Sequence, residues 1–363
     1  MTNKPSRRGT GNSEIDDKLV ELLDQLGAEN NRDQLYEILA TVSQMATHDI
    51  QRLDLKITNS ALREMRTAFR IFGPYTDRPK VTMFGSARTL PSDPLYDQAR
   101  RTAHLLANQG WMVVTGAGPG IMAAGLEGAG REKSMGINIR LPFEQSANEF
   151  IVSDPKLVTM KYFFTRKLML IKESDGFVVL PGGFGTLDEG FELLTLVQTG
   201  KAEPTPIVLL DVPGGTYWKG WEEFIRTEVQ GHGLVSPRDD VLFRITDSAD
   251  EAAAEIIDFY RNYHSRRFVG DRLVLRLRNE PSGDEVAELD SQFRDISVRD
   301  GIVATEASPA EVTEGDELDK ARIAFAFDRM SHARLRELID AVNRLGSAPN
   351  QRMPARHYQE PQT

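Results

Sequence analysis

The chain has 363 residues, with 44 Lys and Arg against 54 Asp and Glu, which gives a formal net charge of −10. This balance argues against a protein that coats nucleic acid, because neutralising phosphates requires a basic surface. The absence of cysteine excludes disulfides, thiolate metal sites and a cysteine nucleophile. No apolar run approaches the roughly 18 residues of a membrane span, and residues 1–13 lack the apolar segment of a secretory signal, so we expect a cytoplasmic protein.

The first 74 residues are expected to form a helical extension. Apolar residues recur there at helical spacing, and Asn12 or Ser13 can cap the first helix while Gly27 follows it as a stop. Such amphipathic helices bury their apolar stripes against a partner surface. The helical stretches are residues 15–26, 35–45 and 62–69.

From residue 81 on, short apolar runs alternate with helix-length segments, as expected for parallel strands that are buried on both faces. The alternation predicts a Rossmann-like, doubly wound α/β sheet over residues 75–265. Such sheets bind ligands at the carboxyl ends of their strands. The predicted strands are residues 81–84, 111–115, 135–141, 176–180 and 206–210, and the predicted helices are residues 95–108, 121–130, 162–173 and 187–198.

A small α+β domain is predicted for residues 266–346. Its first strand, residues 272–278, alternates leucines with other side chains, as a half-buried strand does. The order strand, helix, strand, strand, helix indicates a split-βαβ sandwich. Residues 347–363, rich in Pro, Gln and Arg, are predicted to be a disordered tail. The later elements are a helix at 286–293, strands at 301–306 and 322–327, and a helix at 335–345.

Three glycine-bearing turns follow three of the predicted strands. They are residues 85–88, 116–120 and 181–186, and the last two each open a helix. Glycine lets the backbone approach an anion closely, and a helix N-terminus offers unpaired N–H groups, so each turn can cradle a phosphate. Three such turns on one sheet indicate a phosphate-bearing ligand.

Several common alternatives find no support in the motifs. No lysine occupies a G-x-x-x-x-G-K-[ST] loop, and the glycines at 116, 118 and 120 do not form the G-x-G-x-x-G motif of dinucleotide enzymes. The six histidines are dispersed, and with no cysteine the sequence predicts no metal site. We also expect no cofactor.

The most specific feature is Thr165-Arg166-Lys167, followed by P-G-G-x-G-T-x-x-E at residues 181–189. With these residues the chain resembles the LONELY GUY family of nucleotide-hydrolysing Rossmann-like proteins, once widely mislabelled lysine decarboxylases. The resemblance covers about residues 80–211 and includes the Gly85-Ser86 turn. The long flanks are similar to those of the extended bacterial members.

The resemblance implies hydrolysis of the N-glycosidic bond of nucleoside 5′-monophosphates, with free base and ribose 5-phosphate as products. AMP and cytokinin riboside 5′-monophosphates are the expected kind of substrate. Because the family's active site is commonly shared across a dimer, we expect a homo-oligomer, built as a dimer or from dimers, with no nucleic-acid or membrane partner. The flanks, residues 1–74 and 268–346, are expected to serve assembly or regulation and to supply no catalytic group.

The chemistry assigns roles to the motif. Cleaving an N-glycoside develops oxocarbenium character on the ribose, so a carboxylate is needed near the anomeric carbon to stabilise charge and activate water. Glu189 suits this role because it lies in the first turn of the helix whose N-terminal loop would hold the phosphate. Arg166 is a permanent cation for the ribose phosphate or leaving base, and Lys167 can add charge at the phosphate.

Further contacts to substrate are expected from the turns and from two polar residues. By its spacing from Glu189 in the family, Thr195 would contact substrate through its hydroxyl, and Asn148 would bind base or ribose. Compact members carry an acidic residue in the loop of Asn148, where this chain also has Glu149. The expected binding residues of the turns are Gly85, Ser86, Gly118, Gly120, Gly182, Gly183, Phe184, Gly185 and Thr186.

Three other functions remain open from the sequence. A non-catalytic nucleotide-binding or sensor protein could use the same loops, although pure binding needs no carboxylate beside a phosphate. A pyridoxal-phosphate decarboxylase needs a Schiff-base lysine, and no sequence feature singles one out. A DNA-handling protein of similar fold is disfavoured by the net charge of −10.

Overall fold

The computed structural model describes residues 9–140 and 147–350. The chain forms two compact units, whose described parts are residues 9–63 and 64–350. No helix among the described residues is long and apolar enough to cross a membrane. The tail predicted for residues 347–363 lies outside the described residues beyond Asn350.

The first unit contains α1 (Ser13–Gln25), α2 (Arg32–Met45) and the beginning of α3 (Arg52–Phe72). The side chain of Asn12 caps α1 by accepting from the N–H groups of Glu14 and Ile15. The two short helices pack through a small core of Leu23, Tyr36 and Ala40. The helices predicted from the apolar spacing are therefore present.

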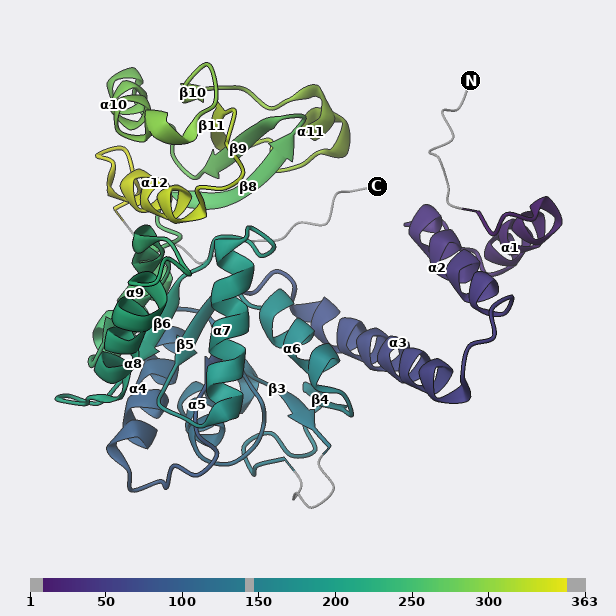
Figure 1. Cartoon of the computed structure of the whole chain (residues 1–363), viewed down its shortest axis with the longest axis horizontal. Coiled ribbons are helices and arrows are strands. Elements are labelled where there is room, and N and C mark those ends of the chain that lie inside the picture. Colours follow the sequence, from purple (N-terminus) through teal and green to yellow (C-terminus); the bar gives the residue numbers. More distant parts are fainter. Residues whose placement is uncertain (1–8, 141–146, 351–363) are drawn as a thin grey trace. The chain divides into compact units, whose positions relative to one another are not determined.

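The second unit is built on a seven-stranded, all-parallel sheet in the order β4-β3-β2-β1-β5-β6-β7 (Figure 1). The predicted doubly wound sheet is confirmed. Two edge strands, β4 and β7, were not predicted, because an edge strand pairs on one side only and needs no continuous apolar run. The strands are β1 (Lys80–Phe84), β2 (Met112–Thr115), β3 (Ser134–Ile139), β4 (Leu157–Met160), β5 (Gly176–Val179), β6 (Ile207–Leu210) and β7 (Arg244–Thr246).

Helices cover both faces of this sheet (Figure 1). One face packs on α4 (Pro94–Asn108), α5 (Ile121–Ala129) and α9 (Ala249–Asp258). The opposite face packs on α6 (Phe163–Lys172), α7 (Phe184–Gln198), α8 (Tyr217–Phe224) and the end of α3. The alternation of β1 shows the division, because Val81 and Met83 face the first layer and Phe84 faces the second.

The C-terminal region is an antiparallel four-stranded sheet in the order β10-β11-β9-β8. The α+β class is confirmed, but the predicted element order lacked β8 and α11. β8 was missed because its polar run His264-Ser265-Arg266-Arg267 hides the strand pattern. The elements are β8 (Tyr263–Val269), β9 (Arg272–Leu277), α10 (Gly283–Phe293), β10 (Val303–Ala304), α11 (Pro309–Glu314), β11 (Ala321–Phe325) and α12 (His332–Arg344).

The strand order reverses direction between β1 and its neighbour β5. Open α/β sheets leave a crevice at such a switch point, at the carboxyl ends of the strands. The turns that follow β1, β2 and β5 therefore meet at one place, which is where a ligand is expected.

Candidate active site

The three glycine-bearing turns and the first turns of α6 and α7 enclose a cleft of about 770 Å³. This volume is in the usual range for small-molecule sites. Its lining contains most of the predicted binding residues. They are Gly85, Ser86, Gly118, Lys167, Gly182, Gly183, Phe184, Gly185 and Thr186, together with Arg166 and Glu189.

The turn after β2 is shaped by contacts that only small residues permit. A Cβ on Gly116 would lie 2.0 Å from a terminal nitrogen of Arg166, so glycine makes room for the guanidinium. Ala117 has a φ of 60° and donates its N–H to the hydroxyl of Thr115 at 3.1 Å. A non-glycine residue in this conformation is strained, which is common at functional loops.

The turn after β5 is tied to its neighbours through its backbone. The amide of Ser86 donates to the carbonyl of Pro181 at 3.3 Å, and the hydroxyl of Tyr217 donates to the carbonyl of Gly182 at 2.7 Å. α7 begins at Phe184, directly after this turn. The N-terminus of α7 is therefore held at the cleft, where its amides and dipole favour an anion.

Arg166 and Glu189 meet in the cleft from two different helices. Nη1 of Arg166 lies 3.2 Å from Oε1 of Glu189, and Nε of Arg166 donates to the carbonyl of Ile137 at 2.9 Å. Their side chains are only 10% and 14% exposed. β3 and α6 thus fix the guanidinium while α7 supplies the carboxylate.

Burial raises the pKa of Glu189, and the charges of Arg166 and Lys167 oppose this rise without cancelling it. A raised pKa lies closer to pH 7, and this makes the carboxylate a more effective proton acceptor. The pair therefore combines a fixed cation with a carboxylate of increased basicity.

Lys167 is bound by two acidic residues of α7. Its Nζ lies 2.7 Å from Oδ2 of Asp188 and 2.7 Å from Oε2 of Glu192. Burial alone would lower the pKa of Lys167, but the hydrogen bonds to these two carboxylates raise it. Lys167 links α6 to α7 and lies at the cleft, where the sequence predicted it.

The end of α3 positions α6 through Glu64. Its Oε1 accepts from the N–H of Lys161 at 3.0 Å, and its Oε2 accepts from the hydroxyl of Thr165 at 2.6 Å. Tyr162, the N-cap residue of α6, gives no side-chain cap. Glu64 does not cap the helix N–H groups, but it holds the residue before the N-cap and the side chain of Thr165, which precedes Arg166.

Three predicted residues are not brought to the lining. Gly120 has a φ of +67°, and a Cβ there would lie 2.3 Å from the carbonyl of Ser86, so its role is to join two turns. Asn148 donates to the carbonyl of Gly118 at 2.8 Å and thereby supports the turn from behind. The hydroxyl of Thr195 donates to the carbonyl of Phe191 within α7.

The cleft also contains residues that the sequence analysis did not select. Arg88 is exposed at the end of the first turn, and no acceptor for its guanidinium is found among the described residues. Asn138 on β3 and Phe163 on α6 add polar and aromatic surface. The position of Arg88 at the end of the turn 85–88, two residues after Ser86, was the available signal. Within the described residues, no cluster of His, Asp and Glu could hold a metal ion.

Part of the chain is similar in sequence to known proteins. Residues 117–256 match the family model described as possible lysine decarboxylase. The chain is 36% identical over 94 residues to the cytokinin riboside 5′-monophosphate phosphoribohydrolase LOG1 of Arabidopsis thaliana, covering 26% of this chain and 42% of that protein. It is 35% identical over 101 residues to the probable enzyme LOGL3 of Oryza sativa subsp. japonica, covering 28% and 46%.

Solved structures resemble the chain more weakly. The molybdenum cofactor binding protein of Rippkaea orientalis is 22% identical and covers 48% of this chain and 91% of its own, with a TM-score of 0.33. A TM-score this low supports no conclusion about this chain.

The match spans less than half the length of the two plant relatives. The family-model match, residues 117–256, includes the Arg166-Lys167 pair and the P-G-G-x-G-T-x-x-E loop. This part of the chain is therefore similar to the LONELY GUY phosphoribohydrolases, as the motif indicated.

Proposed function

We propose that the chain hydrolyses the N-glycosidic bond of nucleoside 5′-monophosphates, releasing a free base and ribose 5-phosphate. The observation that carries this proposal is the Arg166–Glu189 contact of 3.2 Å beside an amide-rich helix N-terminus. AMP and cytokinin riboside 5′-monophosphates are the proposed substrates, since the plant relatives are named for the latter.

The proposed mechanism divides the work between two ends of the cleft. The turn before α7 and the exposed Arg88 hold the 5′-phosphate, which orients the ribose. Ionised Glu189 stabilises the oxocarbenium character that develops as the C1′–N bond breaks, and it accepts a proton from the water that attacks C1′. The base leaves with the electrons of the broken bond and takes up a proton from solvent. Arg166 keeps this carboxylate in place and favours its charged form. No metal or cofactor is required in this scheme.

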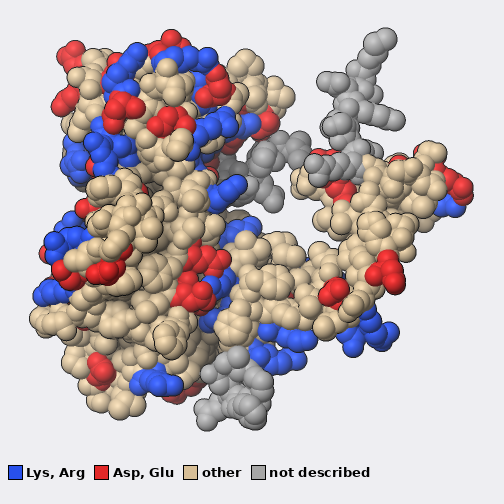
Figure 2. All heavy atoms as spheres, viewed as in Figure 1, with Lys and Arg blue, Asp and Glu red and all other residues tan. Residues whose placement is uncertain are grey.

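Assembly as a homodimer, or from dimers, is part of the proposal. Large apolar side chains on α6 and α7 remain exposed, including Phe164 at 56% and Phe184 at 94%. Both helices cover the same face of the sheet, so a second copy could bury them next to the cleft (Figure 1). Basic and acidic side chains are intermingled on the face in Figure 2, which supports a small-molecule substrate rather than nucleic acid. A cytoplasmic location fits this role.

The test is chromatography of products from a panel of nucleoside monophosphates, with the matching nucleosides as controls. We expect free base and ribose 5-phosphate from AMP and at least about a hundredfold lower kcat/KM for adenosine, because the phosphate supplies the orienting binding energy. Equal turnover of AMP and adenosine would contradict the phosphate site. Tight binding of AMP without any cleavage would instead favour the non-catalytic nucleotide-binding alternative.

A further inference from the structure

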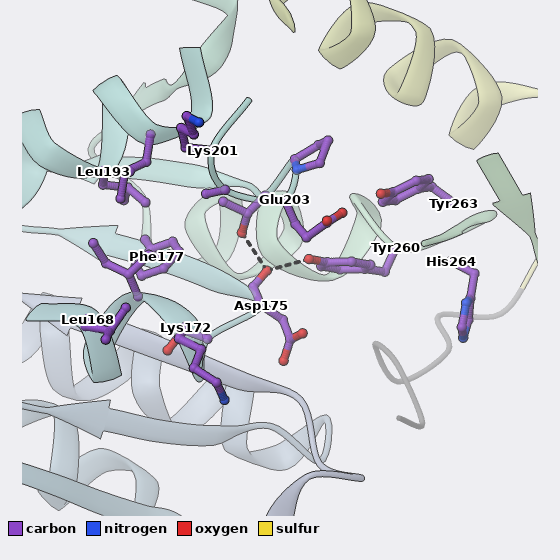
Figure 3. Close-up of a pocket in the computed structure, with 16 residues that line it drawn as sticks. Leu168, Lys172, Asp175, Phe177, Leu193, Lys201, Glu203, Tyr260, Tyr263 and His264 are labelled. Atoms are coloured by element: carbon purple, nitrogen blue, oxygen red, sulfur yellow. Dashed lines mark hydrogen bonds between the residues drawn. The ribbon is translucent and has the colours of Figure 1, made fainter. Parts of the chain in front are cut away.

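A second cavity of about 390 Å³ lies away from the candidate active site (Figure 3). Its lining comes from the ends of α6 and α7, the segment that leads into β5, the loop 201–205, and Tyr260 with β8. Its walls are largely apolar and aromatic. They include Ile171, Phe177, Leu193, Leu196, Tyr260 and Tyr263.

Hydrogen bonds hold the walls of this cavity in place. The carbonyl of Asp175 accepts from the hydroxyl of Thr205 at 2.9 Å and from that of Tyr260 at 2.7 Å (Figure 3). Arg266 donates to Oε2 of Glu203 at 3.0 Å and to the carbonyl of Ala202 at 3.1 Å, which ties the loop to β8. The cavity is therefore formed before any ligand arrives, which lowers the cost of binding.

Most charged groups of the cavity lining have a partner; the carboxylate of Asp175, for example, accepts from the N–H of Lys80 at 3.0 Å. Glu203 is paired with Arg266, and Lys172 lies 2.7 Å from Glu173. Lys201 is exposed, and among the described residues no acceptor is found for its Nζ. Figure 3 draws Lys201 beside Leu193, on the side of the cavity away from Tyr263. An apolar body in the cavity with an anionic group near Lys201 would satisfy both features.

The same two helices connect this cavity to the candidate active site. α6 carries Arg166 and then Ile171, and α7 carries Glu189 and then Leu193. At about 1.5 Å of rise per residue, each cavity residue lies roughly 6–8 Å along its helix from the catalytic pair. A ligand that shifts either helix therefore changes the contact between Arg166 and Glu189.

We propose that this cavity binds a small organic anion with an apolar, aromatic body, and that its occupancy changes the activity of the Arg166–Glu189 site. The binding half stands by itself, whereas the regulatory half rests on the proposed hydrolase function. By linkage, the substrate and the anion must alter each other's affinity by the same factor.

The test uses 8-anilinonaphthalene-1-sulfonate as the anionic probe and N-phenyl-1-naphthylamine as its uncharged analogue. With the full chain we expect one saturable sulfonate site by fluorescence titration. Lys201→Met should weaken the sulfonate about two- to fivefold, the scale of an exposed ion pair, and leave the uncharged analogue unchanged. Leu196→Trp fills the cavity and should weaken both probes at least about tenfold.

Lys219→Met is the matched control, since Lys219 is an exposed lysine on α8 that does not line the cavity. Near-UV circular dichroism checks the fold of Leu196→Trp. Lys201→Met replaces an exposed residue, so its effect on sulfonate binding tests the proposal without a change in packing. No sulfonate binding by the wild-type chain would overturn the proposal. Equal effects of Lys201→Met and Lys219→Met would do so as well, because they would indicate general attraction to basic residues.

The regulatory half is measured as kcat/KM for AMP with and without saturating sulfonate. We expect a change of at least about threefold, within the usual range of coupling between sites, that disappears in Leu196→Trp. Cavity binding without this change would overturn regulation. A chain that binds the probe as expected but hydrolyses no monophosphate would refute the proposed function and leave the binding site intact.

Discussion

This protein contains two buried arginine–glutamate contacts in which the pKa of the glutamate shifts in opposite directions. In the cleft, Glu189 has one arginine, at 3.2 Å. In the small C-terminal sheet, Oε1 of Glu311 lies 2.7 Å from Arg276 and 3.3 Å from Arg322. Oε2 of Glu311 also accepts from the N–H of Ser308 at 2.9 Å.

The pKa values follow from this difference in partners. Burial raises the pKa of Glu189, because its single arginine and the nearby Lys167 do not compensate for lost hydration. Burial acts in the same direction on Glu311, but the hydrogen bonds from Ser308 and Arg276 and the charge of Arg322 lower its pKa to about 2. A fully satisfied carboxylate stabilises the fold, whereas an under-satisfied one remains available to a substrate.

The largest expected effect tests the structural pair. Glu311→Gln should lower the free energy of unfolding by about 3–5 kcal/mol at pH 7, because buried Arg322 loses the carboxylate of Glu311 and buried Arg276 keeps only Asp316. Urea unfolding measures this loss. Glu314→Gln on the same helix is the control, and its partly exposed pair with Arg267 should contribute about 1 kcal/mol or less.

The pH dependence of this loss has a definite sign. The folded pKa of Glu311 is about 2 and its ordinary value is 4.5, so its stabilisation is present above pH 4.5 and disappears as the pH falls towards 2. The difference between wild type and Glu311→Gln should shrink over that range. A difference independent of pH would show that Glu311 acts through packing alone.

The second prediction concerns the catalytic pair. Glu189→Gln and Arg166→Ala should each lower kcat for AMP at least about a hundredfold, the scale of a lost catalytic group. Because the folded pKa of Glu189 is raised, its charge opposes folding above pH 4.5, so Glu189→Gln should keep or increase stability at pH 7. Glu192→Gln on the same helix is the control. Near-normal turnover by Glu189→Gln would refute the assignment.

The third prediction concerns Lys167, whose charge lowers the pKa of Glu189. Lys167→Met should raise that pKa further, so the acidic limb of kcat/KM against pH should move to higher pH. The shift is upward because the ionised form loses a favourable charge. Lys161→Met, just before α6, is the matched control and should leave the limb in place. A downward shift would contradict this prediction, because the charges of Asp188 and Glu192 also raise the pKa of Glu189.

The smallest effect is expected at Glu64, which positions α6 without lining the cleft. Glu64→Ala should lower kcat about tenfold and change KM less, because a slight displacement of Arg166 affects the transition state most. Glu64→Gln keeps an acceptor for one of the two donors and should recover part of the rate. Asp54→Ala, near the beginning of the same helix, serves as the control. An equal loss in the alanine and glutamine variants would argue against positioning by hydrogen bonds.

Much of the site could be predicted from the sequence because its parts are local. The turns at 85–88, 116–120 and 181–186 are set by glycines next to each other in the chain, and the Glu189 motif is contiguous. Gly120 and Asn148 were expected to bind substrate. In the structure, Gly120 allows the backbone of Ser86 to approach closely, and the side chain of Asn148 donates to the carbonyl of Gly118. Whether Thr195 contacts substrate, and where the domain boundaries lie, remain predictions.

The parallel sheet, its glycine-bearing turns and the family motif could be predicted from the sequence, because hydrophobic period and turn chemistry act over a few neighbouring residues. The tertiary structure was needed to show which distant groups meet: Glu64 with Thr165, Arg166 with Glu189, and Asp175 with Tyr260 at the second cavity. It also decided the pKa of each buried glutamate. Burial and the number of partners set that pKa, and both arise from chain segments that are far apart in sequence.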